Sequence, residues 1–301
     1  MAPRQVRTDT ELCRAPGLWA VGPTQLELPF DARGPNAAIR ASGRLKLTPD
    51  LDVFAWLCER WLSTRPLDLD GIAGFTLYDL ATDLYGRRPN GRDRAALRAS
   101  LRRLYRVEIA FTGYDSIDAR AGAFMSMDRL VERIVSDLDT LDGDARKVGA
   151  LRGTSFRVVL APWLRERLTA GAFTYLDWRT LRQLDGLAKR VAVYLAAERF
   201  KSTGDGQAAT WVGLGRPALS SLGADTYARH RDARAALDRA GERIVRVDPR
   251  YASVKCERRA GGWALVAVRR SRVDVDSHAE VRALIAQSLA TASTATASTD
   301  A

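Results

Sequence analysis

The feature that most constrains the fold of this chain is an order of predicted elements that occurs twice. In the first copy, Thr48-Pro49 is typical of a helix start, because Thr caps a helix N-terminus and Pro fits its first turn. Apolar residues at helical spacing follow, and a second helix is predicted over 76–85, where a glycine ends it. A third helix is predicted over 92–106. The alternating stretch 107–112 then predicts a strand that enters a hairpin.

The second copy repeats this order after a predicted strand over 155–160. Its helices are predicted over 177–200, 217–222 and 226–243. Its two strands are predicted over 253–258 and 263–269. Arg259-Ala260-Gly261-Gly262 lies between these strands and predicts a hairpin turn, because glycine adopts the positive φ that such turns need. The repeated order, more than any single element, indicates two domains of one type.

Helix, helix, turn, helix, strand and hairpin is the order of a winged helix, a domain built around a helix-turn-helix. The sequence therefore predicts an α+β protein with two tandem winged-helix domains, over 41–145 and 146–275. We expect a flexible arm over 1–40, which is rich in Pro, Gly and Arg, and a short helix with a disordered Ala/Ser/Thr-rich tail over 276–301. The segment 125–141 suits a helix or a strand, and its start favours a strand.

The charge balance of the chain indicates an anionic partner. The net charge is +11, an excess that usually serves nucleic acid or an anionic membrane surface. No stretch approaches the roughly 20 apolar residues that a transmembrane helix needs. The N-terminal stretch 1–16 is polar and lacks the apolar core of a secretory signal. Three widely spaced cysteines suit a reducing cytoplasm and form no metal-ligand pair, so we expect a cytoplasmic protein without a metal.

A first basic surface is predicted on the helix over 92–106. Its leucines fall on one face and its arginines gather on the other. A solvated helix face usually mixes both signs of charge, but acids are nearly absent here. The planar fork of Arg suits phosphates and guanine, so the pattern favours DNA contact. The candidate DNA-binding residues of the first domain are Arg87, Arg88, Arg92, Arg98, Arg102, Arg103 and Arg106.

A second basic surface is predicted where the helix over 226–243 meets the last hairpin. In helix-turn-helix proteins the N-terminal part of this helix enters the major groove, and the wing meets neighbouring phosphates. The candidate residues of the second domain are Tyr227, Arg229, Arg231, Arg234, Arg258 and Arg259. His230 is expected near the inner face of the helix. Trp211 and four other tryptophans are expected to pack in the core rather than to stack on single strands.

No motif in the sequence indicates an enzyme or a bound cofactor. There is no P-loop, and the two histidines form no His-x-His pair for a rolling-circle nickase. The stretch 213–218 resembles a dinucleotide fingerprint but lacks the βαβ unit around it. A DNA-processing enzyme would need a tyrosine or carboxylate site, for which the unsupported candidates are Tyr105, Tyr114, Tyr175, Tyr194 and Tyr251. We expect no catalytic residue and no cofactor.

The second half resembles the replication initiator (Rep) proteins of theta-replicating plasmids. The stretches that carry the resemblance are 155–164, 173–176, 184–195, 219–223 and 231–240, followed by Ile244. The resemblance implies twin winged helices whose second domain reads the direct repeats (iterons) of an origin. It further implies a first domain that contacts DNA backbone in monomers and mediates dimerisation in autorepressing dimers, and partners that include the host initiator and replicative helicase.

The Arg-rich helix over 92–106 departs from the family pattern. It leaves open whether the first domain mainly dimerises or mainly binds DNA. A winged-helix transcriptional repressor or a partition protein is the alternative to an initiator, and a nickase or recombinase is a third reading. The Ala- and Arg-rich composition indicates a high-GC bacterial host.

Overall fold

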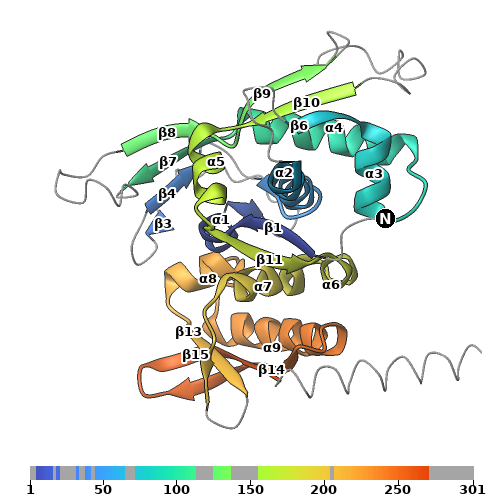
Figure 1. Cartoon of the computed structure of the whole chain (residues 1–301). Coiled ribbons are helices and arrows are strands. Elements are labelled where there is room, and N and C mark those ends of the chain that lie inside the picture. The colour runs from blue at the N-terminus through green and yellow to red at the C-terminus, as the bar shows by residue number, and fades with distance from the viewer. Residues whose placement is uncertain are drawn as a thin grey trace, which may run out of the picture.

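The computed structural model describes residues 5–15, 18–20, 32–33, 38–41, 45–64, 72–112, 125–136, 155–203 and 207–270. Within these ranges helices and strands alternate along the chain, so the fold is of the mixed α and β class (Figure 1). No helix in these ranges is long and apolar enough to cross a bilayer.

Two series of elements, which we call the first repeat and the second repeat, follow the same order. The first repeat comprises α2 (Asp50–Thr64), β6 (Ile72–Thr76), α3 (Leu77–Tyr85), α4 (Gly91–Arg106), β7 (Glu108–Thr112), β8 (Met125–Arg129) and β9 (Val131–Ser136). The second repeat comprises α7 (Gly186–Ala197), β12 (Lys201–Ser202), β13 (Ala208–Gly213), α8 (Arg216–Leu222), α9 (His230–Val247), β14 (Tyr251–Arg259) and β15 (Gly262–Arg269). Both repeats read helix, strand, helix, helix and hairpin strands.

The helix boundaries of the first repeat follow from capping residues. Thr76 and Asp79 form a capping box at the start of α3, and Gly86 ends the helix with φ of 65°. Asn90 and Asp93 form a second capping box at the start of α4. Each box satisfies backbone N–H groups that have no partner inside the helix. The predicted helices over 76–85 and 92–106 are therefore confirmed within one residue at each end.

The strands β6 and β13 lie between the first two helices of their repeats, and the sequence analysis missed both. In the second repeat, β13 pairs with β15, and the sheet order is β12-β13-β15-β14. In the first repeat, β10 (Ser155–Leu160) lies between β6 and β9. The strand over 155–160 was assigned to the second domain, but its neighbours belong to the first repeat. The start of 125–141 is strand, as favoured, and the residues after 136 lie outside the described ranges.

The arm predicted as flexible over 1–40 contains ordered elements, so that prediction is wrong for its described residues. β1 (Gln5–Asp9) pairs antiparallel with β11 (Phe173–Asp177), and β4 (Ala38–Ala41) pairs with β7. Between them lie α1 (Thr10–Arg14), β2 (Trp19–Ala20) and β3 (Ala32–Arg33), while β5 (Leu45–Lys46) pairs with β2.

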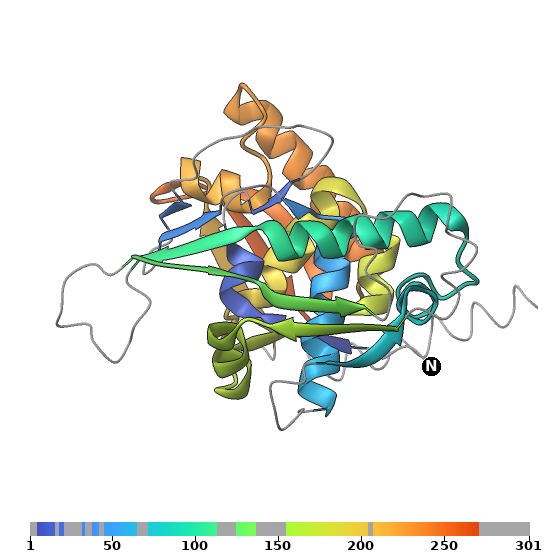
Figure 2. The same ribbon diagram turned by 90° about the horizontal axis from the view of Figure 1, so that it is seen from above.

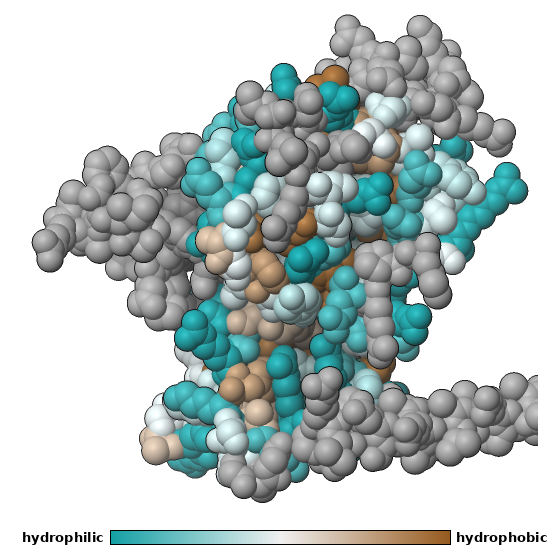
Figure 3. Space-filling view, in the orientation of Figure 1, coloured by the Kyte–Doolittle hydropathy of each residue, from teal (hydrophilic) through white to brown (hydrophobic). Residues whose placement is uncertain are grey.

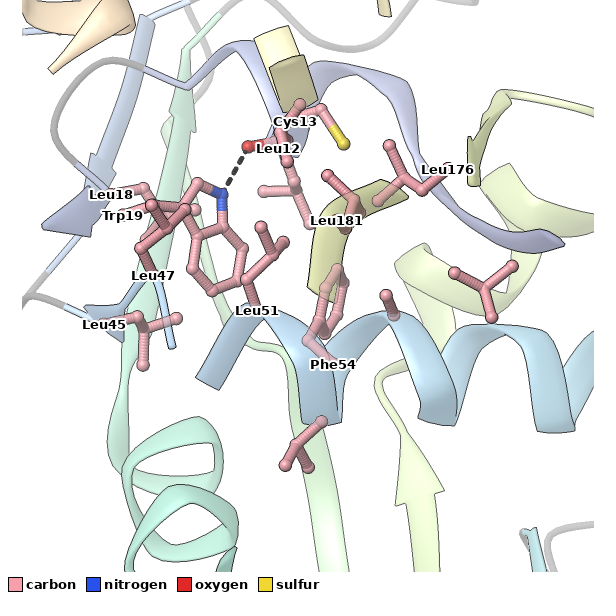
Figure 4. Close-up of a cluster of buried hydrophobic side chains, with 14 of the residues drawn as sticks. Leu12, Cys13, Leu18, Trp19, Leu45, Leu47, Leu51, Phe54, Leu176 and Leu181 are labelled. Carbon is pink, nitrogen blue, oxygen red and sulfur yellow. Dashed lines mark hydrogen bonds between the residues drawn. The ribbon is translucent and has the colours of Figure 1, made fainter. Parts of the chain in front are cut away.

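A few apolar side chains explain why the segment orders. Leu12 and Trp19 are almost completely buried. The Trp19 indole donates a hydrogen bond to the carbonyl oxygen of Leu12 (2.8 Å; Figure 4). Asp9 is fully buried and accepts a hydrogen bond from Arg167 of α5 (Pro162–Thr169) at 2.7 Å. The segment lacks periodicity because it completes a core formed by α2 and β11 rather than a core of its own.

The long helix predicted over 177–200 is two helices. α6 (Trp178–Gln183) ends at Leu184, and α7 begins at Gly186, whose φ is +46°. The predicted apolar stripe nevertheless faces the core, because Leu181, Leu184 and Val191 are buried. The side chain of Arg190 is also fully buried and donates hydrogen bonds to two carbonyl oxygens of the N-terminal segment, which ties α7 to that segment.

Candidate nucleic-acid interface

Helix α4 has one apolar face and one arginine face, as predicted. Leu97, Leu101 and Leu104 are fully buried against the first repeat. Seen from above, α4 lies alongside the strands β9 and β10 (Figure 2). Four of the predicted DNA-binding arginines have no ion pair with any other described residue: Arg88, which precedes the helix, and Arg92, Arg98 and Arg106 within it. Such unbalanced charge is what a phosphate-binding face requires.

Burial and the neighbouring Arg102 both lower the pKa of Arg98. The two arginines are four residues apart on α4, so their side chains are neighbours on one face of the helix and their charges repel each other. An arrangement of this kind costs free energy in the free protein and is relieved by a bound anion. The α4 face thus favours an anionic partner.

Two arginines of the predicted set are engaged within the molecule. Arg87 forms an ion pair with Asp93, at 2.8 Å between Nη1 and Oδ2. Arg103 donates to both carboxylate oxygens of Asp50, at 2.6 and 2.7 Å. The Asp50 side chain is fully buried, so Arg103 serves to compensate its charge. The sequence pattern predicts Arg103 among the DNA-binding residues, and nothing near it in the sequence indicates its pairing with Asp50.

The residues that precede and begin α9 form an exposed segment that carries Arg229 and Arg231. Residues 225–232 are all exposed, including Tyr227, Arg229 and Arg231. The side chain of Arg231 is 76% exposed and lies 3.6 Å from Asp232 in a solvent-facing ion pair. Helix α9 begins at His230, four residues later than predicted. Tyr227 and Arg229 therefore lie in the turn before the helix, and His230 is exposed rather than near the inner face.

Arg234 and the hairpin of β14 and β15 are in direct contact. The Arg234 guanidinium lies over the Trp263 ring, with its carbon 3.8 Å from the ring centroid. Trp263 pairs across the hairpin with Arg258. A cation held on an aromatic face keeps its charge while losing conformational freedom. The stack therefore fixes a candidate base-reading arginine relative to the hairpin.

The backbone of α9 also touches the hairpin. A Cβ atom on Gly241 would lie 2.0 Å from the Val254 carbonyl oxygen, so only glycine fits this approach. The Asp238 carboxylate accepts a hydrogen bond from the Cys256 N–H at 2.6 Å. Burial, with Asp238 nearby, raises the pKa of the Cys256 thiol to about 12. Helix and hairpin thus form one rigid surface.

The hairpin tip and its aromatic neighbour depart from the prediction in one respect. Arg258 and Arg259 are exposed at the end of the hairpin, as expected. Trp211 is 62% exposed and lies under Arg259, so its assignment to the core is wrong. On this strand Trp211 alternates with the buried Thr210, so the two side chains lie on opposite faces of the sheet. Trp263 was missed altogether, although it too is a bulky residue at the edge of a basic turn.

In the orientation of Figure 1, hydrophilic side chains cover much of the visible surface, and most of the hydrophobic ones lie in patches between them (Figure 3). Burial raises the pKa of both Tyr194 and Tyr251, so their hydroxyl groups stay protonated at neutral pH. Tyr114, another tyrosine candidate for a DNA-processing enzyme, lies outside the described residues.

No group of three or more His, Cys, Asp or Glu that could hold a metal occurs in the part of the chain that the structure describes.

The molecule is therefore an α+β protein with two basic surfaces, and comparison with solved structures adds a likeness of fold. The crystal structure of RctB domains 2 and 3 (RctB residues 155–483) matches with a TM-score of 0.51 at 15% identity, over 88% of this chain and 98% of that one. A selenomethionine derivative of the same two domains gives a TM-score of 0.49 at 14% identity, over 84% and 94% of the two chains. No family model and no curated protein sequence matches the chain.

Proposed function

We propose that this protein binds specific sites on double-stranded DNA at a replication origin and thereby initiates replication. The observation that carries the proposal is the repeated order of helix, strand, helix, helix and hairpin, with an arginine surface on the third helix of both copies. In this proposal each repeat is a winged helix. The fold likeness to RctB domains 2 and 3 supports a tandem arrangement of the same extent.

The second repeat supplies the sequence-specific contacts. The exposed segment 225–232 leads into α9 and enters the major groove, where Arg229 and Arg231 read base edges. Arg258 and Arg259 of the hairpin meet the adjacent phosphates. Because α9 and the hairpin are packed backbone to backbone, both contacts form in one fixed register.

The first repeat supplies contacts that do not depend on sequence. The arginines of α4 without an ion-pair partner neutralise phosphates and release counterions. The resemblance to plasmid initiators extends the proposal to iteron repeats as targets, to autorepression by a dimer, and to recruitment of the host initiator and replicative helicase. The protein acts without catalysis of its own and without a cofactor.

A DNase footprint on the DNA that flanks the gene tests this function. We expect protection in a ladder of direct repeats spaced by whole helical turns, and loss of that ladder in Arg231→Ala. Arg179→Ala, which removes an exposed arginine from α6, is the matched control and should footprint as the wild type does. One protected palindrome would instead identify a repressor. Absence of any sequence-specific protection, or cleavage of a strand, would overturn the proposal.

A further inference from the structure

A cavity lies between the first repeat and the helices α6 and α7. Its volume is about 530 Å³, which is within the usual range for sites that bind small molecules. In Figure 1, α2 and α3 lie above α6 and α7. Residues of all four helices line the cavity. Cavities at the junction of two structural units are common ligand sites. No element of the proposed DNA interface lines it, because α4, α9 and the hairpin lie elsewhere.

The walls of the cavity are mainly apolar. Leu84 of α3 and the residues Leu181 and Leu184 of the α6 region contribute aliphatic surface, and Tyr85 and Trp178 add aromatic surface. Trp178 is 4% exposed, so it forms part of a fixed wall. An apolar enclosure of this size favours the apolar body of a small organic molecule.

One side of the cavity is an ion pair that is already balanced. The Lys189 ammonium donates to the Thr48 hydroxyl at 2.8 Å and to both oxygens of Asp52, at 2.7 and 2.8 Å. Lys189 is 3% exposed, and its three donors are all used. Burial raises the pKa of Asp52, and Lys189 opposes that effect. These groups hold α2 against α7 and leave no charge to attract a ligand.

Two cations at the rim of the cavity, unlike Lys189, have no ion-pair partner among the described residues. Lys46 and Arg182 are exposed and line the cavity, and neither forms an ion pair with a residue that the structure describes. Arg182 donates to the carbonyl oxygen of Asp83 and lies over the Trp178 ring, so its guanidinium is held in place. The carboxylates of Asp52 and Asp83 attract it without forming an ion pair with it. The one rim acid, Asp185, is paired with Arg243.

We propose that this cavity binds a small organic anion, with its apolar body between Leu84, Leu181 and Leu184 and its phosphate or carboxylate on Lys46 and Arg182. The ligand would contact α3 of the first repeat and α6, which leads directly into α7 of the second repeat. It would therefore stabilise the arrangement in which both repeats are held together. Occupancy is thereby linked to the affinity for DNA that both repeats contact, since linkage between two sites is reciprocal. This effector site goes beyond the proposed function and does not require it.

Thermal unfolding and calorimetric titration of the full chain without DNA test the proposal. The probes are AMP, ATP, indole-3-acetate and octanoate, which separate a phosphate from a carboxylate and a base from a plain apolar body. We expect at least one probe to raise Tm and to bind with a Kd in the millimolar range or below. Arg182→Gln and Lys46→Gln should each weaken that probe about tenfold, the value of one charge-assisted contact. Both side chains are exposed, so both variants should fold.

Lys201→Gln provides the matched control, because Lys201 is an exposed cation on β12 outside the cavity. It should bind the probe as the wild type does. Leu184→Trp should fill the cavity and abolish binding, with circular dichroism reporting that the fold is kept. The proposal is overturned if no probe binds the wild type, or if Lys201→Gln weakens binding as much as Arg182→Gln does. Because the titration contains no DNA, this outcome is independent of the footprint.

Discussion

In the second repeat, β13 pairs directly with β15, whereas in the first repeat β10 lies between β6 and β9. The arginines differ in the same way. Arg231 at the start of α9 pairs with Asp232, and both side chains face solvent, whereas Arg103 of the first repeat donates to the fully buried Asp50. The second repeat is thus a self-contained sheet whose arginine edge faces solvent. The first repeat uses part of its positive charge to hold itself together, and only the remainder is available to DNA.

The largest expected effect is on the structural arginine of the first repeat. Arg103→Ala leaves the fully buried Asp50 carboxylate without its ion-pair partner. Breaking a buried ion pair in this way typically costs about 3–5 kcal/mol. We expect the free energy of unfolding, measured with urea, to fall by that amount.

Asp93→Ala is the control, because its partner Arg87 is 54% exposed. It also removes half of a capping box, so its cost should be about 1 kcal/mol. If both variants lost the same free energy of unfolding, Arg103 would not be held by Asp50. Arg103 would then be available to bind DNA, as the sequence predicted.

The next prediction separates contacts to DNA bases from contacts to the DNA backbone. Arg231→Ala in the second repeat should weaken binding to the specific site by about 1–3 kcal/mol and leave binding to random DNA nearly unchanged. Arg92→Ala in the first repeat should weaken both equally and lower the slope of log K against log salt by about 0.9. Gel-shift titrations at several salt concentrations measure both quantities. If the two variants behaved alike, the distinction between the repeats would fail.

How far the sequence could anticipate this comparison depends on whether a signal is local. The spans of α3 and α4, the glycine turn of the last hairpin and the arginine face of α4 depend on neighbouring residues, and each was predicted. The strands β6 and β13 are short, and their partners lie far along the chain, so nothing local marks them. The buried acid of α2 that holds Arg103 lies 53 residues away from it. The N-terminal segment orders only because β11 and α2 are there to receive it.

A smaller effect concerns the stack between α9 and the hairpin. Trp263→Ala removes the ring under Arg234, a contact that is worth about 0.5–1 kcal/mol at an exposed site. If the stack orients Arg234 toward DNA, specific affinity should fall about two- to fivefold. Trp263→Phe keeps an aromatic face and should recover most of the loss. Wild-type affinity in the alanine variant would show that Arg234 needs no such support.

The smallest effect is pH-dependent and lies at the edge of α2. Burial alone would raise the pKa of Glu59, but hydrogen bonds from Arg7 and Ser63 outweigh it and hold the pKa below its ordinary value of 4.5. A carboxyl group with a lowered pKa stabilises the fold above its unfolded pKa, and that contribution is lost as pH falls through the folded pKa. Arg7 is partly exposed, so the contribution should be about 1 kcal/mol after allowance for solvent screening.

Glu59→Gln should therefore be less stable than the wild type by about that amount at neutral pH. Urea unfolding of both proteins between neutral pH and acid measures the difference. It should stay constant down to about pH 5 and then shrink as the wild-type carboxylate is protonated. Since Arg7 lies on β1 and Glu59 on α2, the same measurement tests whether the N-terminal strand is held to the first repeat in solution. A difference that did not change with pH would mean that the strand is anchored by its pairing with β11 alone.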